Sequence, residues 1–234
     1  MADFKYKRVL LKLSGEAISG DGSIIDFDFL DRIAQTLVEL SNEGAQIAAV
    51  FGAGNIWRGR SGGDMNRVEG DHMGMLATVI NAIAVKDAII RAGGKAVVMT
   101  ATDMEPFAEY YSTDRAIAAL EEGKIVIFGG GTGCPYVSTD TAGILRAIEI
   151  QADALLLAKN VDGIYDRFPE LPGAKFLEKL TYSEILSKNL KAIDLTAAAL
   201  GADFGPDAFA FKLADTEDIK KAMYGTCRGT TIVK

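Results

Sequence analysis

Short apolar runs rich in β-branched residues recur along the chain, and most of them lead into a loop that contains glycine. Runs of this length, bounded by turn residues, are typical of buried strands. They predict five strands, at residues 7–13, 46–51, 95–100, 124–128 and 153–158, and two later strands at residues 207–213 and 229–234.

Between these runs, apolar residues recur every three or four positions, which is the period of a helix with one buried face. Residues 26–44 show this pattern and stop at a glycine, where a left-handed residue commonly ends a helix. Residues 71–92 repeat it with the following apolar face: Leu76, Val79, Ile80, Ile83 and Ile90. Two further helices are predicted to begin near Thr139 or Asp140 and near Thr216.

The alternation of strands and helices predicts an α/β fold, a three-layer αβα sandwich around a mostly parallel sheet. No linker, repeat or low-complexity tract divides the chain, so we expect a single domain over residues 1–234. The helix at residues 71–92 is apolar over more than one face. It is therefore a candidate for subunit packing, with burial inside the domain as the alternative.

Composition favours a small ligand over a polymeric partner, and a reducing compartment over an oxidising one. The net charge of −7 argues against general nucleic-acid binding, although a local basic pocket could hold a phosphorylated ligand. Cys134 and Cys227 match no metal-ligand or redox spacing and are expected to be free thiols. The amino-terminal apolar run is too short for a signal peptide, and we see no apolar segment long enough to cross a bilayer. We therefore expect a cytoplasmic protein without a membrane partner.

Four loops follow predicted strands, where open α/β sheets bind their ligands. The first contains Lys12, Ser14 and Gly15, the second runs over residues 52–59 and contains Arg58, and the others follow residues 128 and 157. Any one glycine there is explained by a tight turn that requires positive φ. Several such loops at one sheet edge instead form an array of backbone N–H groups that binds anions, and Lys12 and Arg58 add full charges. Together the loops predict a phosphate site.

The common phosphate motifs are absent. Neither GxxxxGK[ST] nor GxGxxG occurs in the first strand-to-helix turn. The only histidine, His72, is better explained by a capping or surface position, and no base and nucleophile are paired for covalent catalysis. Phosphoryl transfer needs mainly positioning and charge neutralisation, which lysine, arginine, backbone amides and Mg²⁺ provide.

Several longer motifs carry a family resemblance. The segments LLKLSGEA, GNIWRG, MNRVEGDHMGMLATVINAIA, GTGCPYVSTDTA, VDGIYD and LTYSEIL occur in this order. From about residue 7 to its end the chain resembles the bacterial uridylate kinases of the amino-acid kinase superfamily. This resemblance implies an enzyme that transfers the γ-phosphoryl group of ATP to UMP, giving UDP and ADP in pyrimidine nucleotide biosynthesis.

The resemblance also implies roles for individual residues. Lys12, Arg58 and Asp140 correspond to the catalytic residues. The implied ATP-binding residues are Lys12, Leu13, Ser14, Gly15, Gly54, Arg58, Lys159, Asn160, Tyr165 and Phe168, with Lys159 and Asn160 as alternatives in an ambiguous register. The implied UMP-binding residues are Ala53, Asp71, Thr132, Gly133, Cys134, Pro135, Tyr136, Val137, Ser138 and Thr139. In this assignment Asp71, at a predicted helix start, accepts the ribose hydroxyls.

The implied cofactor is Mg²⁺, bound mainly through nucleotide phosphates without a direct protein ligand. The implied assembly is a homohexamer, with GTP as activator and UTP as inhibitor. The chain departs from the family pattern at Ala53, Cys134 and Phe168, where relatives carry glycine, asparagine and aspartate. Two other functions remain open: a nucleotide- or oxyanion-binding storage protein on the same scaffold, and a kinase that phosphorylates an amino-acid carboxylate.

Overall fold

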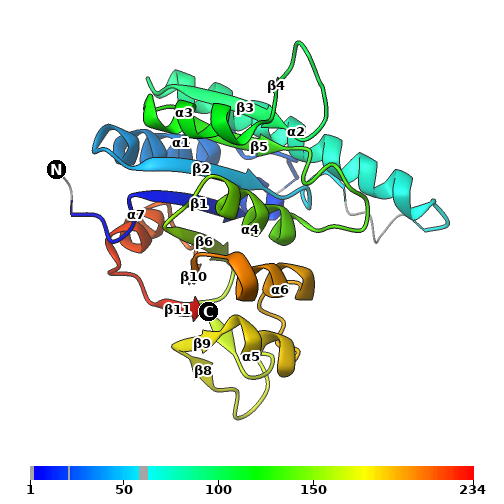
Figure 1. The fold of residues 1–234 in the computed structure, drawn as a ribbon, viewed down its shortest axis with the longest axis vertical. Helices are drawn as coiled ribbons and strands as arrows, with labels where there is room; N and C mark the ends of the chain where they lie inside the picture. Colours follow the sequence, from blue (N-terminus) through cyan, green and yellow to red (C-terminus); the bar gives the residue numbers. More distant parts are fainter. Residues whose placement is uncertain (1–2, 21, 58–62) are drawn as a thin grey trace.

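A nine-stranded sheet organises the part of the chain that the structure, a computed structural model, describes: residues 3–20, 22–57 and 63–234 (Figure 1). The strand order is β4-β3-β5-β2-β1-β6-β10-β11-β9. Within the described residues every neighbouring pair is parallel except β10 and β11. The strands are β1 (Arg8–Leu13), β2 (Gln46–Phe51), β3 (Ala96–Thr100), β4 (Glu109–Tyr110), β5 (Ile125–Gly129), β6 (Ala154–Lys159), β9 (Lys179–Thr181), β10 (Asp207–Lys212) and β11 (Gly229–Val233). A separate hairpin joins β7 (Ile164–Tyr165) to β8 (Phe176–Leu177).

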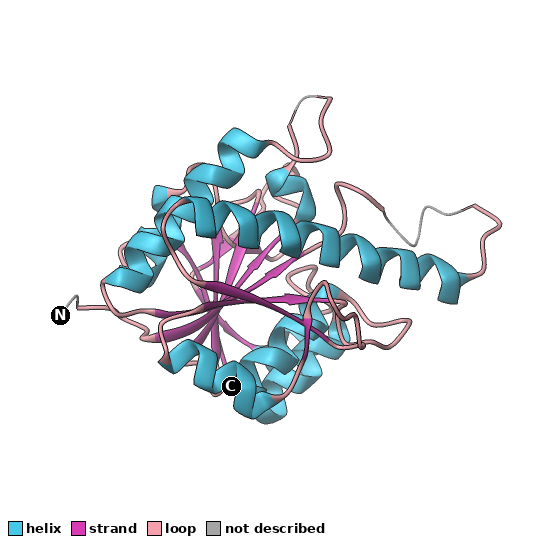
Figure 2. Ribbon diagram, turned by 90° about the horizontal axis from the view of Figure 1, so that it is seen from above, coloured by secondary structure: helices cyan, strands magenta, loops and turns pink. Residues whose placement is uncertain are grey.

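Helices cover both faces of the sheet, so the expected three-layer α/β fold is confirmed (Figure 2). The helices are a short 3₁₀ turn η1 (Gly15–Ile18), α1 (Phe27–Asn42), α2 (Arg67–Arg91), α3 (Thr113–Glu121), α4 (Thr139–Glu149), α5 (Tyr182–Ser187), α6 (Leu195–Phe204) and α7 (Glu217–Tyr224). One core cluster joins the sheet to α1, α2 and α7, and the other joins it to α3, α4, α5 and α6.

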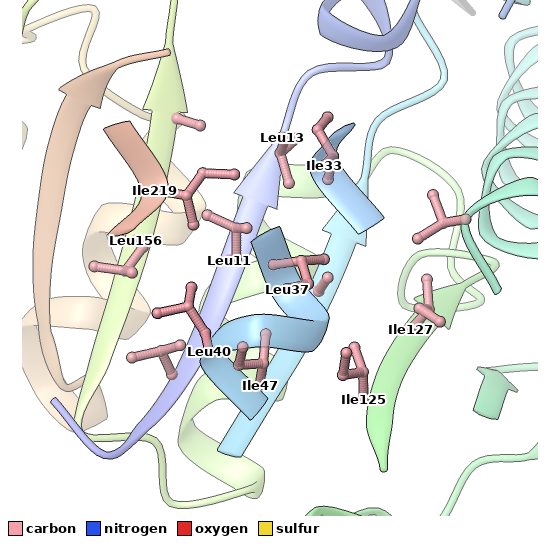
Figure 3. Packing of buried hydrophobic residues seen from close by; sticks show 14 of the residues in the cluster. Leu11, Leu13, Ile33, Leu37, Leu40, Ile47, Ile125, Ile127, Leu156 and Ile219 are labelled. Carbon is pink, nitrogen blue, oxygen red and sulfur yellow. The ribbon is translucent and has the colours of Figure 1, made fainter. Parts of the chain in front are cut away.

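The strands are apolar on both faces because both faces are buried. In β1, Leu11 and Leu13 point into the first cluster and Leu10 into the second. Figure 3 shows the first cluster, where Leu37 of α1 and Ile219 of α7 pack against this face of the sheet. This packing fixes the carboxyl ends of β1, β2, β5 and β6, from which the predicted ligand loops emerge.

Side-chain caps mark the starts of α1 to α6, whereas α7 has no such cap. Asp26 accepts a hydrogen bond from the backbone of α1, and Ser138 does the same for α4, which begins at the predicted position. The prediction for α2 was wrong at its start, because Asn66 caps the helix and places Asp71 at its fifth position. Four strands and three helices were not predicted: β4, β7, β8, β9, α3, α5 and α6.

The buried face of α2 also differs from the prediction. Of the large residues expected to face the sheet, only Val79 is buried, whereas Leu76, Ile80, Ile83 and Ile90 are exposed. The core side of α2 is formed by mostly smaller residues: Ala77, Val79, Ala82, Val85, Ala88 and Ile89. Small side chains allow this helix to approach β3 and β5 closely. Of its two apolar faces, the one with the smaller side chains is therefore buried.

The length of α2 corrects a further expectation. With 25 residues and a mean hydropathy of 1.6 over its most apolar window, it meets the length and composition of a bilayer-crossing helix. In this structure it packs on the sheet and on α1, and 44% of that window is buried. A core helix of a globular protein passes the same test.

Candidate functional site

A charged cluster lies where β1, β6 and α4 meet. Lys12, near the end of β1, places its Nζ 2.8 Å from Oδ1 of Asp140, which is in the first turn of α4. Lys159 ends β6, the strand next to β1, and its Nζ donates to the Ala192 carbonyl at 2.5 Å. The parallel topology therefore brings two ammonium groups to one carboxylate at a single sheet edge.

The pKa shifts reflect this crowding. Burial acts to raise the pKa of the Asp140 carboxyl, but the charges of Lys12 and Lys159 outweigh it and hold the pKa below its usual value. Burial lowers the pKa of Lys159, Asp140 opposes this, and the charge of Lys12 adds to the lowering. Two cations around one anion leave positive charge that a phosphoryl group would neutralise.

The loops after β1 and β2 are packed against each other without space for a side chain at Gly15. A Cβ there would lie 2.4 Å from both the Gly52 carbonyl oxygen and Oδ1 of Asn55. Asn81 of α2, fully buried, donates to Gly52 O at 2.8 Å and to Asn55 Oδ1 at 2.9 Å, and Asn55 Nδ2 donates back to Asn81 Oδ1 at 3.0 Å. These bonds hold the second loop to α2. Arg58, predicted to act here, lies outside the described residues.

A cavity of about 520 Å³, named here the α2 cavity, is bordered by α2, by the loop after β5 and by the start of α6. It is lined by seven residues predicted for UMP: Ala53, Asp71, Thr132, Tyr136, Val137, Ser138 and Thr139. Gly133, Cys134 and Pro135 do not line it. Gly133 has φ +79°, and a Cβ built there would lie 3.3 Å from Ala101 Cβ. Cys134 is exposed.

Asp71 ties α2 to the loop after β5. Both its carboxylate oxygens accept from Nε of Arg67 at 2.8 Å, and Oδ2 also accepts from the backbone N–H of Tyr136 at 2.8 Å. Two turns further along, the Thr78 hydroxyl accepts from the N–H of Gly130 at 2.8 Å. The helix α2 thus positions two points of the loop after β5, at Gly130 and at Tyr136.

A second cavity of about 470 Å³, named the hairpin cavity, lies beside β7 and the segment from residue 188 to 192. Three of the residues predicted to bind ATP line it: Lys159, Tyr165 and Phe168. Arg167 and Lys191, which the sequence did not single out, also line it. Asn160 is not among the lining residues, so of the two alternatives the structure brings only Lys159 to the cavity. The Thr230 hydroxyl accepts from Ile164 N at 2.8 Å and donates to the Leu177 carbonyl at 2.6 Å, which fastens both strands of the hairpin to β11.

Asp194 was missed by sequence reasoning, although it lines the α2 cavity. Its carboxylate caps α6 by accepting from Ala197 N at 3.0 Å, and it accepts from the hydroxyls of Ser138 and Thr141 at the start of α4. An aspartate before an apolar helical run predicts a cap, but nothing local in sequence shows that the cap faces α4. Trp57 and Arg67 also line the cavity and were also missed, because nothing local in sequence shows which cavity a side chain faces.

The remaining predicted residues have simpler positions. Leu13 ends β1 and is fully buried, and Ser14 accepts from Glu16 N at 3.3 Å. His72 lies inside α2, which Asn66 caps, so it is not a cap itself. Its side chain is about half exposed, with Nδ1 3.7 Å from Oε2 of Glu69. Cys134 and Cys227 are free thiols, as expected.

Comparison with known proteins places these observations in a family. A family model described as the amino acid kinase family matches residues 7–215. The crystal structure of UMP kinase from Bacillus anthracis is similar at 35% identity and a TM-score of 0.92, covering 97% of this chain and 96% of that one. UMP kinase from Ureaplasma parvum is similar at 33% identity and a TM-score of 0.92, with 98% and 100% covered. Uridylate kinase from Archaeoglobus fulgidus shares 26% identity at a TM-score of 0.72, with 96% and 99% covered. The expected resemblance, and with it the expectation of a kinase, is confirmed.

Proposed function

The chain belongs to the amino acid kinase family, and from that premise we propose that it transfers the γ-phosphoryl group of ATP to UMP, giving UDP and ADP. The observation that carries the proposal is the cluster of Lys12, Asp140 and Lys159. Lys159 lines the hairpin cavity, while Asp140 directly follows Thr139 of the α2 cavity. A group transferred from one cavity to the other would meet the positive charges of Lys12 and Lys159.

In this proposal the hairpin cavity takes ATP and the α2 cavity takes UMP. Lys12 neutralises the charge that develops on the transferring group, and Asp140 holds the Lys12 ammonium in place through their 2.8 Å ion pair. The attacking oxygen belongs to the UMP phosphate, which approaches the γ-phosphorus in line, opposite the bond to the ADP leaving group. Because this oxygen is already anionic, the mechanism requires no general base. Arg58 is proposed to share the charge neutralisation.

Mg²⁺ is the proposed cofactor, held mainly by nucleotide phosphate oxygens. Within the described residues, no group of three or more His, Cys, Asp or Glu side chains is placed to hold a metal ion. When bound, Mg²⁺ would neutralise phosphate charge and orient the γ-phosphoryl group.

Whole-chain organisation and assembly extend the proposal. Both cavities are lined by segments that follow strands of one continuous sheet, so residues 1–234 are proposed to act as a single domain. Leu76 and Ile80 are about half exposed on α2, with Met73 and Ile83 on either side at helical spacing. Such an apolar stripe supports subunit packing, and we propose a homohexamer that responds to GTP and UTP. A cytoplasmic location is proposed with it.

The direct test replaces Lys12 with alanine. Turnover of ATP and UMP should fall at least about 100-fold, since a group that stabilises developing charge is lost, while UMP affinity changes by less than about threefold. Lys95→Ala is the matched control because this exposed lysine precedes β3, at the opposite end of a parallel strand. A Lys12→Ala enzyme with wild-type turnover would refute the assignment.

A further inference from the structure

Three residues form a contact at the amino-terminal end of α2, named here the acceptor latch: Arg67 and Asp71 of α2, and Tyr136 of the loop after β5. The carboxylate of Asp71 is 12% exposed and accepts from Nε of Arg67 and from the backbone N–H of Tyr136, each at 2.8 Å. The Arg67 guanidinium carbon also lies 5.7 Å from the centroid of the Tyr136 ring. All three residues line the α2 cavity.

The backbone of Tyr136 needs such support. Its φ is +67°, a left-handed conformation that costs an aromatic residue free energy and that persists only when surrounding contacts fix it. Here the N–H of Tyr136 is bound by Asp71 and its ring lies against Arg67. The strained turn is therefore held by the same carboxylate that is proposed to receive the ribose.

We infer that Arg67 is a positioning residue for the acceptor nucleotide, a role that rests on the proposed function. Arg67 holds Asp71 in one orientation, and Asp71 in turn keeps the loop at Tyr136 in contact with α2. Ribose hydroxyls then meet an acceptor that is already oriented, which reduces the entropy lost on binding.

This role makes a specific prediction about the sugar. A carboxylate accepts from hydroxyl donors, and the 2′-hydroxyl distinguishes UMP from dUMP. When Asp71 loses its orientation, the contribution of the 2′-hydroxyl falls, so UMP affinity should drop more than dUMP affinity. A purely structural role of Arg67 would weaken both nucleotides equally.

Trp57 provides a readout that does not depend on catalysis. It is the only tryptophan in the chain, it lines the α2 cavity, and its indole N–H donates to the Gly70 carbonyl at 2.8 Å, next to Asp71. Titration of its fluorescence with UMP and with dUMP gives both dissociation constants. The variants are Arg67→Ala and Arg67→Lys. The control is Arg91→Ala, which removes an Arg–Asp pair four residues apart at the other end of α2, together with the ion pair from Arg91 to Asp31 of α1.

In Arg67→Ala the dissociation constant for UMP should rise about tenfold, as expected for a lost charge-assisted contact, and the preference for UMP over dUMP should fall at least about threefold. Arg67→Lys should lose less UMP affinity than Arg67→Ala and keep more of the preference for UMP over dUMP, because lysine keeps the charge but lacks the planar donor geometry. Arg91→Ala should match the wild type. Equal weakening of both nucleotides, or no weakening in Arg67→Ala, would overturn the inference.

A second measurement tests the latch without any nucleotide. If the wild type does not bind UMP, the proposed function is contradicted, and this measurement still decides whether Arg67 holds the loop. Selective ¹⁵N labelling of the seven tyrosines gives a sparse amide spectrum, in which Tyr136→Phe identifies the Tyr136 signal. That signal should shift in nucleotide-free Arg67→Ala and stay in place in Arg91→Ala. An unchanged Tyr136 signal in Arg67→Ala would show that Arg67 does not hold the loop.

Discussion

Replacing Gly15 with alanine should separate the loops after β1 and β2 without removing any functional group. The new Cβ would lie 2.4 Å from two oxygens of the second loop, well inside the 3.0 Å that such carbons essentially never cross. One of these oxygens is a backbone carbonyl and the other is fixed by Asn81, so neither yields easily. The loops must move apart by at least about 0.6 Å. Since misplacement by about 1 Å can cost about 100-fold in rate, we expect turnover to fall between about 10-fold and 100-fold.

The assay is ADP release from ATP and UMP, together with a thermal melt to separate activity from folding. Overpacking of this kind should cost about 1–3 kcal/mol of stability, which leaves a folded protein to measure. Gly143→Ala is the matched control, because its Cβ would lie near Lys12 yet meet only ordinary contacts of 3.7–3.8 Å. Wild-type turnover in Gly15→Ala would refute the view that contact between these loops sets the geometry of the site.

Three further predictions test other parts of the site. Thr230→Val should raise the KM for ATP several-fold with little change for UMP, because the β7–β8 hairpin loses two hydrogen bonds worth about 1 kcal/mol each; initial-rate kinetics with both nucleotides checks this. Leu76→Glu combined with Ile80→Glu should reduce the mass measured by light scattering, since charge cannot be buried in an apolar subunit contact; an unchanged mass would exclude this face. Asp140→Asn should destabilise the protein by about 2 kcal/mol or more at pH 7. The folded pKa of Asp140 lies below its ordinary 3.8, so its stabilisation is complete above that value and is lost as pH falls through the folded pKa. The melting temperatures of variant and wild type should therefore converge as the pH is lowered through that range.

The strands and the sheet edge that carries the site could be predicted from sequence because their signal is local. A strand buried on both faces is a continuous apolar run, and the residues that follow it must lie at its carboxyl end. The order of apolar runs and loops is therefore enough to assign Lys12 and the loop after β5 to one edge. Short edge strands such as β4 and β9 contribute two or three residues each, too few for a pattern.

Other features depend on what packs against what, which a single sequence does not state. The helix α2 has two apolar faces, and the choice between them depended on the space beside the sheet. Asp194 was invisible as a site residue because its partners, Ser138 and Thr141, lie more than 50 positions away. The resemblance also implied contacts that the α2 cavity does not include. Cys134 belongs to the expected UMP loop, yet it is exposed and does not line the cavity.

The central claim is that this chain phosphorylates UMP at the expense of ATP. The most direct test is a coupled ADP-release assay with ATP and Mg²⁺ in which UMP, CMP, dTMP and acetylglutamate are offered as separate acceptors. We predict turnover with UMP and little with the others. Turnover with acetylglutamate alone would identify a carboxylate kinase, and a folded protein that binds ATP but turns over no acceptor would contradict the account and favour a binding or storage role.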